Sequence, residues 1–439
     1  MLVAATAASV CAAPANGRAE SGPQSENCAP RHGTTLGLVA CELARGLPQS
    51  ASETLVVTAA LSGELTKERR AELGGRLSAL VAGELGPKAR ALSGIVSSLA
   101  AHAAARGARV VLLRAELDRS RLSATADVLA SAPRFWERFA DQAWRIIAHA
   151  FAAQPLDAEL RSSLPRVPLV ISKIHKATLD EPAVALACGD IDGDGSPELT
   201  VVGRRRTRLG RIVSGAFQAS RTAAWSDLSP LAGAPLREPI AGAVLRSDGT
   251  LSVGTTDRQN LVLLDRDLKV LGRAPGRIPW SASSCARRSG LGLAADEVAC
   301  SGAMPAAAPG VVVDAVAAAR LVGRDGSSQN VLALRRQSDG HVSIRFGARK
   351  LELAEPVGAQ LALGDLDGDG QLELLSSEAT ADPAADALKI RTLPENGPLA
   401  PGLSVPVPSG LQALAICPPG SNGFSMIVAA TGDGLWVLQ

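Results

Sequence analysis

The feature that most constrains this chain is a fourteen-residue segment that occurs twice. The copies are LACGDIDGDGSPEL, Leu186 to Leu199, and LALGDLDGDGQLEL, Leu361 to Leu374. In both, a turn rich in aspartate and glycine separates two apolar runs. An apolar–turn–apolar unit that recurs along a chain is typical of a repeat architecture built from short β-strands.

The acidic residues of both turns share one spacing, with acids at positions one, three, five and nine. Calcium takes about six to eight oxygen ligands, and alternate residues of a tight turn point inward. We therefore predict Ca²⁺ bound by four carboxylates and by the backbone carbonyl of position seven. The ligands are Asp190, Asp192, Asp194, Ser196 and Glu198 in the first acidic loop, and Asp365, Asp367, Asp369, Gln371 and Glu373 in the second acidic loop.

The glycines of these loops permit the positive-φ backbone that such a turn needs; they are Gly193, Gly195, Gly368 and Gly370. An EF-hand is disfavoured, because position twelve is Val201 or Ser376 rather than glutamate. The alternative is a pair of solvated acidic turns without metal.

The segments GDIDGDGSPELTVVG and GDLDGDGQLELLSSE resemble FG-GAP/VCBS repeats, the calcium-binding repeats of integrin-type β-propellers. The resemblance implies that each repeat forms most of a four-stranded blade, with the loop between its first two strands. It also implies Ca²⁺ at the eight carboxylates. The family usually has Asp at position nine, so Glu198 and Glu373 imply a weaker site.

Residues 165–439 are expected to form an all-β propeller of about six blades, because short β-prone runs alternate there with Gly, Asp and Pro turns. The expected blade starts lie near Val184, Ile240, Ser281, Asp314, Gln360 and Leu411. The last blade lacks a strand, which Val167–Lys176 is expected to supply, closing the ring. A closed ring would make Cys188 and Cys417 neighbours able to form a disulfide.

The chain has seven cysteines. Without Cys11, an even set remains, which in an exported chain indicates disulfides. The local pairs are Cys28–Cys41 and Cys285–Cys300. The alternative is that several are free, buried thiols.

Residues 1–35 are interpreted as a signal peptide, leader and linker, with an A-x-A cleavage site at Ala13–Ala15 and no basic n-region. Cys11 is a candidate for a lipid anchor, although Val10 before it is a poor fit for lipoprotein cleavage. The protein is therefore expected in the periplasm, at the cell surface or outside the cell. No later stretch of about 20 apolar residues predicts a membrane span.

Residues 36–164 are expected to form a small α/β domain. The pattern predicts a helix from Leu36 that Pro48 ends, a strand at Glu53–Leu61, a helix capped by Thr66, a helix at Ala91–Ala105 and a strand at Arg109–Glu116. Phe135–Ala153 has apolar residues at helical spacing. An exported α/β domain before a propeller is similar in plan to TolB, the periplasmic propeller protein of the Tol system.

The composition disfavours several classes of function. The net charge of +2 gives no electrostatic footprint for nucleic acid. Aromatic residues are 3% and tyrosine is absent, which disfavours an aromatic sugar platform. The five histidines are scattered, no nucleophile motif appears, and the basic run Gly203–Arg211 is expected to be a solvated hairpin.

The sequence thus predicts a non-enzymatic, calcium-binding module that binds a protein or glycan on one propeller face. The alternatives are an exported propeller hydrolase or lyase, and a Tol-like envelope protein that binds peptides.

Overall fold

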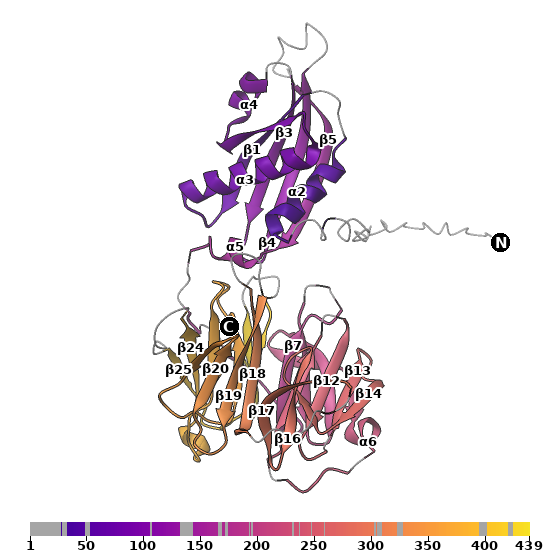
Figure 1. Cartoon of the computed structure of the whole chain (residues 1–439), viewed down its shortest axis with the longest axis vertical. Helices are drawn as coiled ribbons and strands as arrows, with labels where there is room; N and C mark the ends of the chain where they lie inside the picture. Colours follow the sequence, from indigo (N-terminus) through magenta and orange to yellow (C-terminus); the bar gives the residue numbers. More distant parts are fainter. Residues whose placement is uncertain are drawn as a thin grey trace, which may run out of the picture.

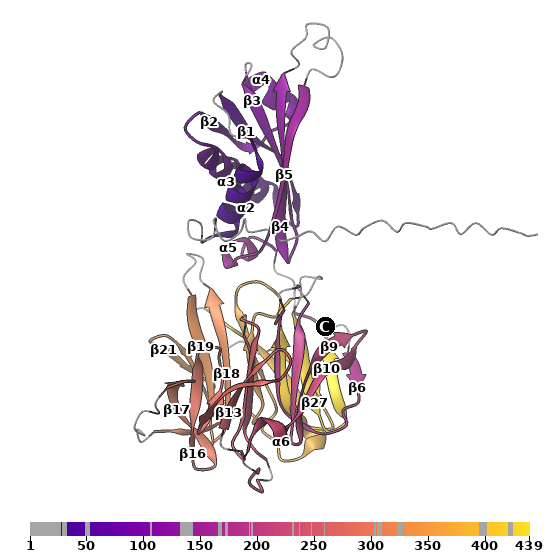
Figure 2. The same cartoon turned by 90° about the vertical axis from the view of Figure 1, so that its right-hand side faces the viewer.

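The computed structural model describes residues 28, 33–48, 53–105, 108–131, 144–165, 169–171, 174–192, 194, 196–230, 232–236, 238–246, 248–258, 260–302, 304, 310–322, 328–394, 402–419 and 425–439. The expected cleavage site and Cys11 lie outside these residues. Figures 1 and 2 show one mixed sheet with helices above a group of antiparallel sheets.

The first part of the chain forms a five-stranded sheet in the order β2-β1-β3-β4-β5. Strands β2 and β3 run parallel to β1, whereas β4 and β5 continue the sheet as antiparallel neighbours. The elements are α2 (Thr35–Gly46), β1 (Thr54–Gly63), α3 (Lys67–Leu85), β2 (Ala89–Ile95), α4 (Ser98–Ala105), β3 (Arg109–Leu117), β4 (Arg121–Ser131), β5 (Trp144–Pro155) and α5 (Ala158–Arg161).

Helices α2 and α3 cover one face of this sheet, as Figure 2 shows. Their apolar stripes, with Leu43 and Leu77 almost inaccessible, pack against alternate residues of the strands. Thr34 and Thr66 cap the two helices by accepting hydrogen bonds from Gly37 N and Arg69 N. Both helices and the strands at β1 and β3 agree with the sequence prediction.

Two predictions for this region are wrong. Ala91–Ala105 is not one helix, because Ala89–Ile95 pairs with β1 as β2 and only Ser98–Ala105 is helical. The helical spacing assigned to Phe135–Ala153 also fails, since Trp144–Pro155 is a strand paired with β4. Burial there alternates, with Ala150 and Ala152 buried around an exposed Phe151. Residues 132–143 lie outside the described part.

The remaining described strands form five sheets, and their neighbours are antiparallel. The first sheet has β7 (Ala183–Gly189), β8 (Glu198–Gly203), β9 (Arg206–Val213) and β10 (Ala216–Ala224), followed by α6 (Trp225–Leu228), and the second has β11 (Ala241–Leu245), β12 (Thr250–Thr255), β13 (Asn260–Asp265) and β14 (Val270–Pro275).

The third sheet has seven strands: β15 (Arg277–Pro279), β16 (Ser284–Ser289), β17 (Gly292–Ala299), β18 (Val312–Val322), β19 (Ser328–Arg336), β20 (Val342–Phe346) and β21 (Arg349–Glu352). Here two expected blades are joined in one sheet. Strands β17 and β18 pair through Leu293–Val313 and Ala294–Val312. The edge of β17, which would be free if these were two separate blades, is therefore paired.

The fourth sheet contains β22 (Leu361–Gly364), β23 (Leu372–Ser376), the 3-10 turn η2 (Pro383–Ala385), β24 (Ala387–Leu393) and β25 (Leu403–Pro406). The fifth contains β26 (Leu411–Cys417), β27 (Met426–Thr431), β28 (Gly434–Leu438) and β6 (Ile174–Ala177). One cavity is lined by the first strand of each four-stranded sheet and by two strands of the seven-stranded sheet. These strands are β7, β11, β22 and β26, together with β15 and β18.

The segment before the first repeat completes the last sheet, as predicted, although the paired strand is Ile174–Ala177 and not the whole of Val167–Lys176. Strand β6 pairs antiparallel with β28, and Lys176 Nζ lies 3.9 Å from the centre of the buried Trp436 ring. Strands β26 and β7 also share a core cluster. The predicted disulfide joins Cys188 of β7 to Cys417 of β26, and Cys28–Cys41 and Cys285–Cys300 form too.

Candidate metal-binding loops and central cavity

Both acidic loops connect the first two strands of a sheet. The first loop joins β7 to β8 and the second joins β22 to β23, and equivalent pairs, Gly189–Glu198 and Gly364–Glu373, close the two hairpins. The closing glutamate is thereby fixed in a strand, while the aspartates project from the turn. The sequence repeat is thus also a structural repeat.

The second acidic loop brings three predicted ligands together. Single carboxylate oxygens of Asp365, Asp367 and Glu373 lie within 4.8 Å of one another. Backbone amides shape the turn: Gly368 N and Gly370 N donate to the two oxygens of Asp365 at 2.8 and 3.1 Å, and both glycines have positive φ, as predicted.

Asp369 lies outside that group of three, and the backbone carbonyl of Gln371 stays a predicted ligand. Asp369 Oδ1 accepts a hydrogen bond of 2.8 Å from Gln371 N, which makes a local turn. The pair thus shapes the turn around the convergent oxygens. An all-oxygen donor set of this kind suits a hard cation such as Ca²⁺ or Mg²⁺.

The convergent carboxyl groups of the second loop are buried or partly buried, and they repel one another. Glu373 is only 1% exposed. Burial is the main reason that its pKa rises to about 8, and the neighbouring aspartates add to the effect, although Leu366 N donates to it at 2.8 Å. Burial likewise raises the pKa of Asp365 to about 6, and raises the pKa of Asp367. A bound divalent cation would relieve this concentration of negative charge.

The first acidic loop is similar in its spacing but differs in its surroundings. Oxygens of Asp190, Asp192 and Asp194 lie within 4.8 Å of one another. Glu198 is 5% exposed and accepts a hydrogen bond of 2.9 Å from Ile191 N, which matches the contact between Glu373 and Leu366. Gly193 and Gly195 lie outside the described residues.

A guanidinium group lies against the first loop. Arg211 of β9 contacts Asp192 at 2.9 Å, Asp194 at 2.8 Å and Glu198 as well. The Ser196 amide, more than Arg211, keeps the pKa of Asp194 below its usual value. Sequence reasoning missed this contact. The basic run Gly203–Arg211 contains the residue, but only the strand register shows that its last arginine turns back to the loop.

The second loop also touches the neighbouring parts of the chain. Arg161, the last residue of α5, has a guanidinium nitrogen 3.8 Å from Asp365. Ser425 Oγ donates to the backbone oxygen of Asp365 at 2.9 Å. The loop therefore lies where the N-terminal sheet region meets the antiparallel sheets.

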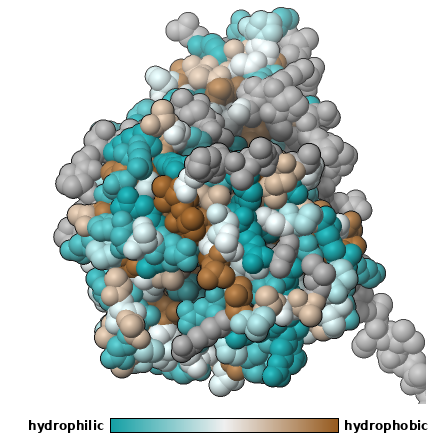
Figure 3. Space-filling model, turned by 60° about the horizontal axis from the view of Figure 1, so that its bottom comes forward, coloured by the Kyte–Doolittle hydropathy of each residue, from teal (hydrophilic) through white to brown (hydrophobic). Residues whose placement is uncertain are grey.

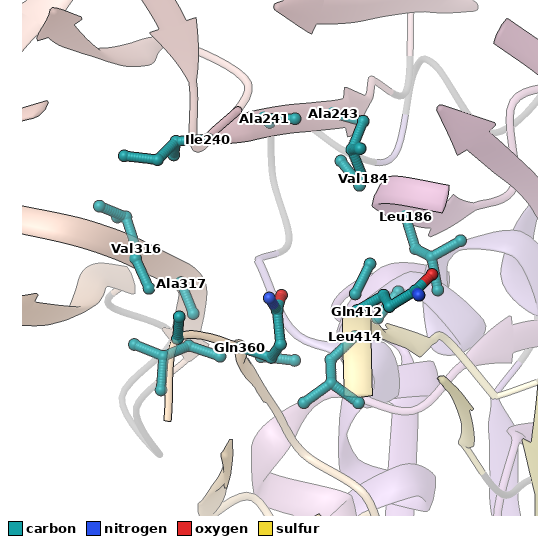
Figure 4. A pocket seen from close by; sticks show the side chains of 18 of the residues that line it. Val184, Leu186, Ile240, Ala241, Ala243, Val316, Ala317, Gln360, Gln412 and Leu414 are labelled. Carbon is teal, nitrogen blue, oxygen red and sulfur yellow. The ribbon is translucent and has the colours of Figure 1, made fainter. Parts of the chain in front are cut away.

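The cavity between the sheets has a volume of about 1530 Å³. Figure 4 shows Val184, Leu186, Ala241, Ala243 and Leu414 around it, with the amides of Gln360 and Gln412 among these apolar side chains. Figure 3 shows apolar side chains near the middle of the end facing away from the N-terminal sheet, among mostly hydrophilic ones. The wall thus combines apolar and polar groups in about equal measure.

Several acidic groups of the cavity wall are held by the fold. Arg335 forms an ion pair with Asp314. Asp386 accepts backbone hydrogen bonds from Glu378 N, Ala387 N and Leu411 N at 2.7–3.0 Å. Glu378 itself pairs with Lys389 at 2.5 Å. These carboxylates orient strands and turns around the cavity.

No protein-family model matches the chain, and no curated protein matches it. Among solved structures, a DUF4221 family member from Bacteroides vulgatus has a TM-score of 0.37 at 8% identity, with 62% of this chain and 97% of that one covered. TolB from Acinetobacter baumannii has a TM-score of 0.31 at 10% identity, with coverage of 90% and 94%.

Hydrazine synthase from Kuenenia stuttgartiensis has a TM-score of 0.34 at 11% identity, covering 57% of this chain and 74% of that one. Likenesses of this size leave the function open. Within the described residues, no helix has the length and apolar character needed to cross a membrane.

Proposed function

We propose that this protein is an exported, calcium-binding β-propeller that acts as a binding or scaffolding module for a protein or glycan in the cell envelope. The observation that carries the metal assignment is the second acidic loop. There a carboxylate with 1% exposure and two aspartates converge within 4.8 Å on a turn held by backbone amides. Such a set is costly without a cation and favourable with one.

The propeller of about six blades, of FG-GAP/VCBS type, is supported by the common cavity of the six first strands and by the last sheet. That sheet takes its outer strand from residues 174–177, before the first repeat. The contact between β26 and β7, with the disulfide between them, favours a closed ring. Both acidic loops would then lie at equivalent places in two blades.

An extracytoplasmic location is supported by the disulfides. All six cysteines of the described residues are paired, as is common in proteins of oxidising compartments. A binding role is favoured over catalysis by the cavity wall, where Asp314, Asp386 and Glu378 already serve as partners of arginine, backbone and lysine. A large cavity lined by both apolar and polar groups suits a ligand-binding surface.

The test is thermal unfolding of the full oxidised chain in CaCl₂, in MgCl₂ and in EGTA. We expect calcium to raise Tm above the EGTA value and magnesium to raise it less, since Mg²⁺ loses its water ligands reluctantly. Identical melting curves in CaCl₂ and EGTA would refute the metal assignment.

The binding role is tested with the same protein as bait in envelope extract, followed by calorimetry with each purified candidate. A true partner should bind in CaCl₂ and bind more weakly in EGTA. The matched control is Glu373→Gln, which keeps the shape of the loop but removes a proposed ligand charge. If no candidate binds with a measurable Kd in either buffer, the scaffolding role is rejected.

A further inference from the structure

One difference between the two acidic loops lies outside the repeated sequence, on the third strand of each sheet. In the first sheet, the residue that pairs with the closing Glu198 across the β8–β9 ladder is Arg211. In the fourth sheet, the residue that pairs with Glu373 across β23–β24 is Thr392. The third strand therefore presents a cation to one loop and a neutral hydroxyl to the other.

Arg211 contacts two of the three convergent aspartates of the first loop and its closing glutamate. Its guanidinium contacts Asp192, Asp194 and Glu198, and planar guanidinium groups match carboxylates closely. A divalent ion within bonding distance of those oxygens would lie beside this positive charge and be repelled by it. The first loop thus already holds a cation supplied by its own sheet.

The second loop receives no such charge from its own sheet at the matching position. A cation does approach it from outside the sheet: Arg161 of α5 lies 3.8 Å from Asp365 and is 30% exposed. A side chain with one long contact can move into solvent more readily than a guanidinium shared by three carboxylates. Of the three convergent acids of this loop, Glu373 is buried and Asp365 and Asp367 are partly buried, so water screens their negative charge less than it screens the exposed Asp192 and Asp194 of the first loop.

The first loop is also held in a way that needs no metal. Cys188, two residues before Asp190, is bonded to Cys417 of the last strand group. The disulfide and Arg211 together fix β7, β8 and β9 where the chain's first and last antiparallel sheets meet. The second loop has no comparable covalent link within its own sheet among the described residues.

Building on the proposed calcium binding, we propose that the residue opposite the closing glutamate decides which cation each loop holds. Arg211 neutralises the first loop from within, whereas Thr392 leaves the second loop to a divalent ion. The wild-type chain therefore binds one Ca²⁺ tightly, at Asp365, Asp367 and Glu373, and the first loop binds it at least about tenfold more weakly.

The test exchanges the two residues in the full oxidised chain. Calcium stoichiometry is measured by titration calorimetry with CaCl₂ after removal of metal. We expect one site in the wild type, two in Arg211→Thr, none in Thr392→Arg, and one in the double exchange. Glu373→Gln should abolish the wild-type site and leave one site in the Arg211→Thr background.

The matched control is Arg206→Thr, which removes an arginine of the same strand that pairs with Asp180 and Glu181 and not with the loop. Its stoichiometry should remain one. Far-ultraviolet circular dichroism verifies that each variant is folded. Because Arg211→Thr is expected to gain a calcium site, unfolding would not explain that result.

Two tight sites in the wild type, or no added site in folded Arg211→Thr, would overturn this inference and leave the proposed calcium binding in place. If neither the wild type nor Arg211→Thr binds Ca²⁺, the proposed function fails along with the inference.

Discussion

Replacing Glu373 with glutamine should change stability in opposite directions without and with calcium. The substitution keeps the side-chain shape and an oxygen that can accept the hydrogen bond from Leu366 N, but removes the charge. In the metal-free fold, burial raises the pKa of Glu373 from 4.5 to about 8. A carboxyl with a raised pKa contributes stability that is present below pH 4.5 and is lost as pH rises toward about 8.

The size of the effect follows from that pKa. Between 4.5 and a pH near 7, the unfolded chain releases the proton while the folded chain retains it, which costs the wild type about 3 kcal/mol. Glutamine carries no such cost. In EGTA near neutral pH, Glu373→Gln should therefore be up to about 3 kcal/mol more stable than the wild type, and the difference should vanish near pH 4.

Calcium should reverse the order. An ion present at about a thousand times its Kd adds about 4.1 kcal/mol to the wild type, which exceeds the deficit of about 3 kcal/mol, whereas the variant lacks one ligand charge and gains little. The assay is urea unfolding of the oxidised full chain, at acidic, neutral and mildly alkaline pH, in EGTA and in CaCl₂. The free energy of unfolding is taken from matched slopes.

Glu198→Gln is the matched control from the first loop. There the carboxylate is an ion-pair partner of Arg211, so its removal should destabilise the protein in EGTA. If Glu373→Gln also destabilises the metal-free protein near neutral pH, the cost of burying the Glu373 charge does not control stability at this position, and the prediction is refuted.

Two further predictions concern the framework that holds the loops. Replacing Cys188 and Cys417 with alanine removes a disulfide that links residues 229 positions apart, and should lower the free energy of unfolding in urea by about 5 kcal/mol. The same change at Cys285 and Cys300, which are 15 positions apart, should lower it by about 3 kcal/mol. Equal losses would contradict the role assigned to the long link. Trp225→Phe should lower stability by about 1–3 kcal/mol in the same assay, because the buried indole fills the core and donates a hydrogen bond of 2.9 Å to a carbonyl of β8; an unchanged midpoint would contradict it.

The local spacing of the acidic loops and the added strand of the last sheet could be predicted from the sequence. The repeated turn brings Asp365, Asp367 and Glu373 near one another, because two alternate positions of a tight turn and one position of the next strand have little freedom. The pairing of Cys188 with Cys417 was predicted from the missing strand in the last sheet. A β-prone segment before the first repeat could supply that strand, and this would bring the first and last sheets together.

The errors arose where the apolar pattern was ambiguous. The stretch that contains β5 is rich in alanine, which is small enough for either a helix or a sheet face, and its burial follows period two only once β4 is beside it. The union of β17 with β18 likewise depends on a pairing of two residues, Leu293 and Ala294, that no turn signal announces.

The contrast between the acidic loops shows why a ligand motif alone is an incomplete description of a metal site. Both copies keep the same acids, yet Arg211 lies across from Glu198 while Thr392 lies across from Glu373. The deciding charge belongs to the third strand, and the antiparallel register of that strand brings it back to the turn. A repeat that retains every carboxylate can therefore exchange an external cation for an internal one through a single substitution outside the motif.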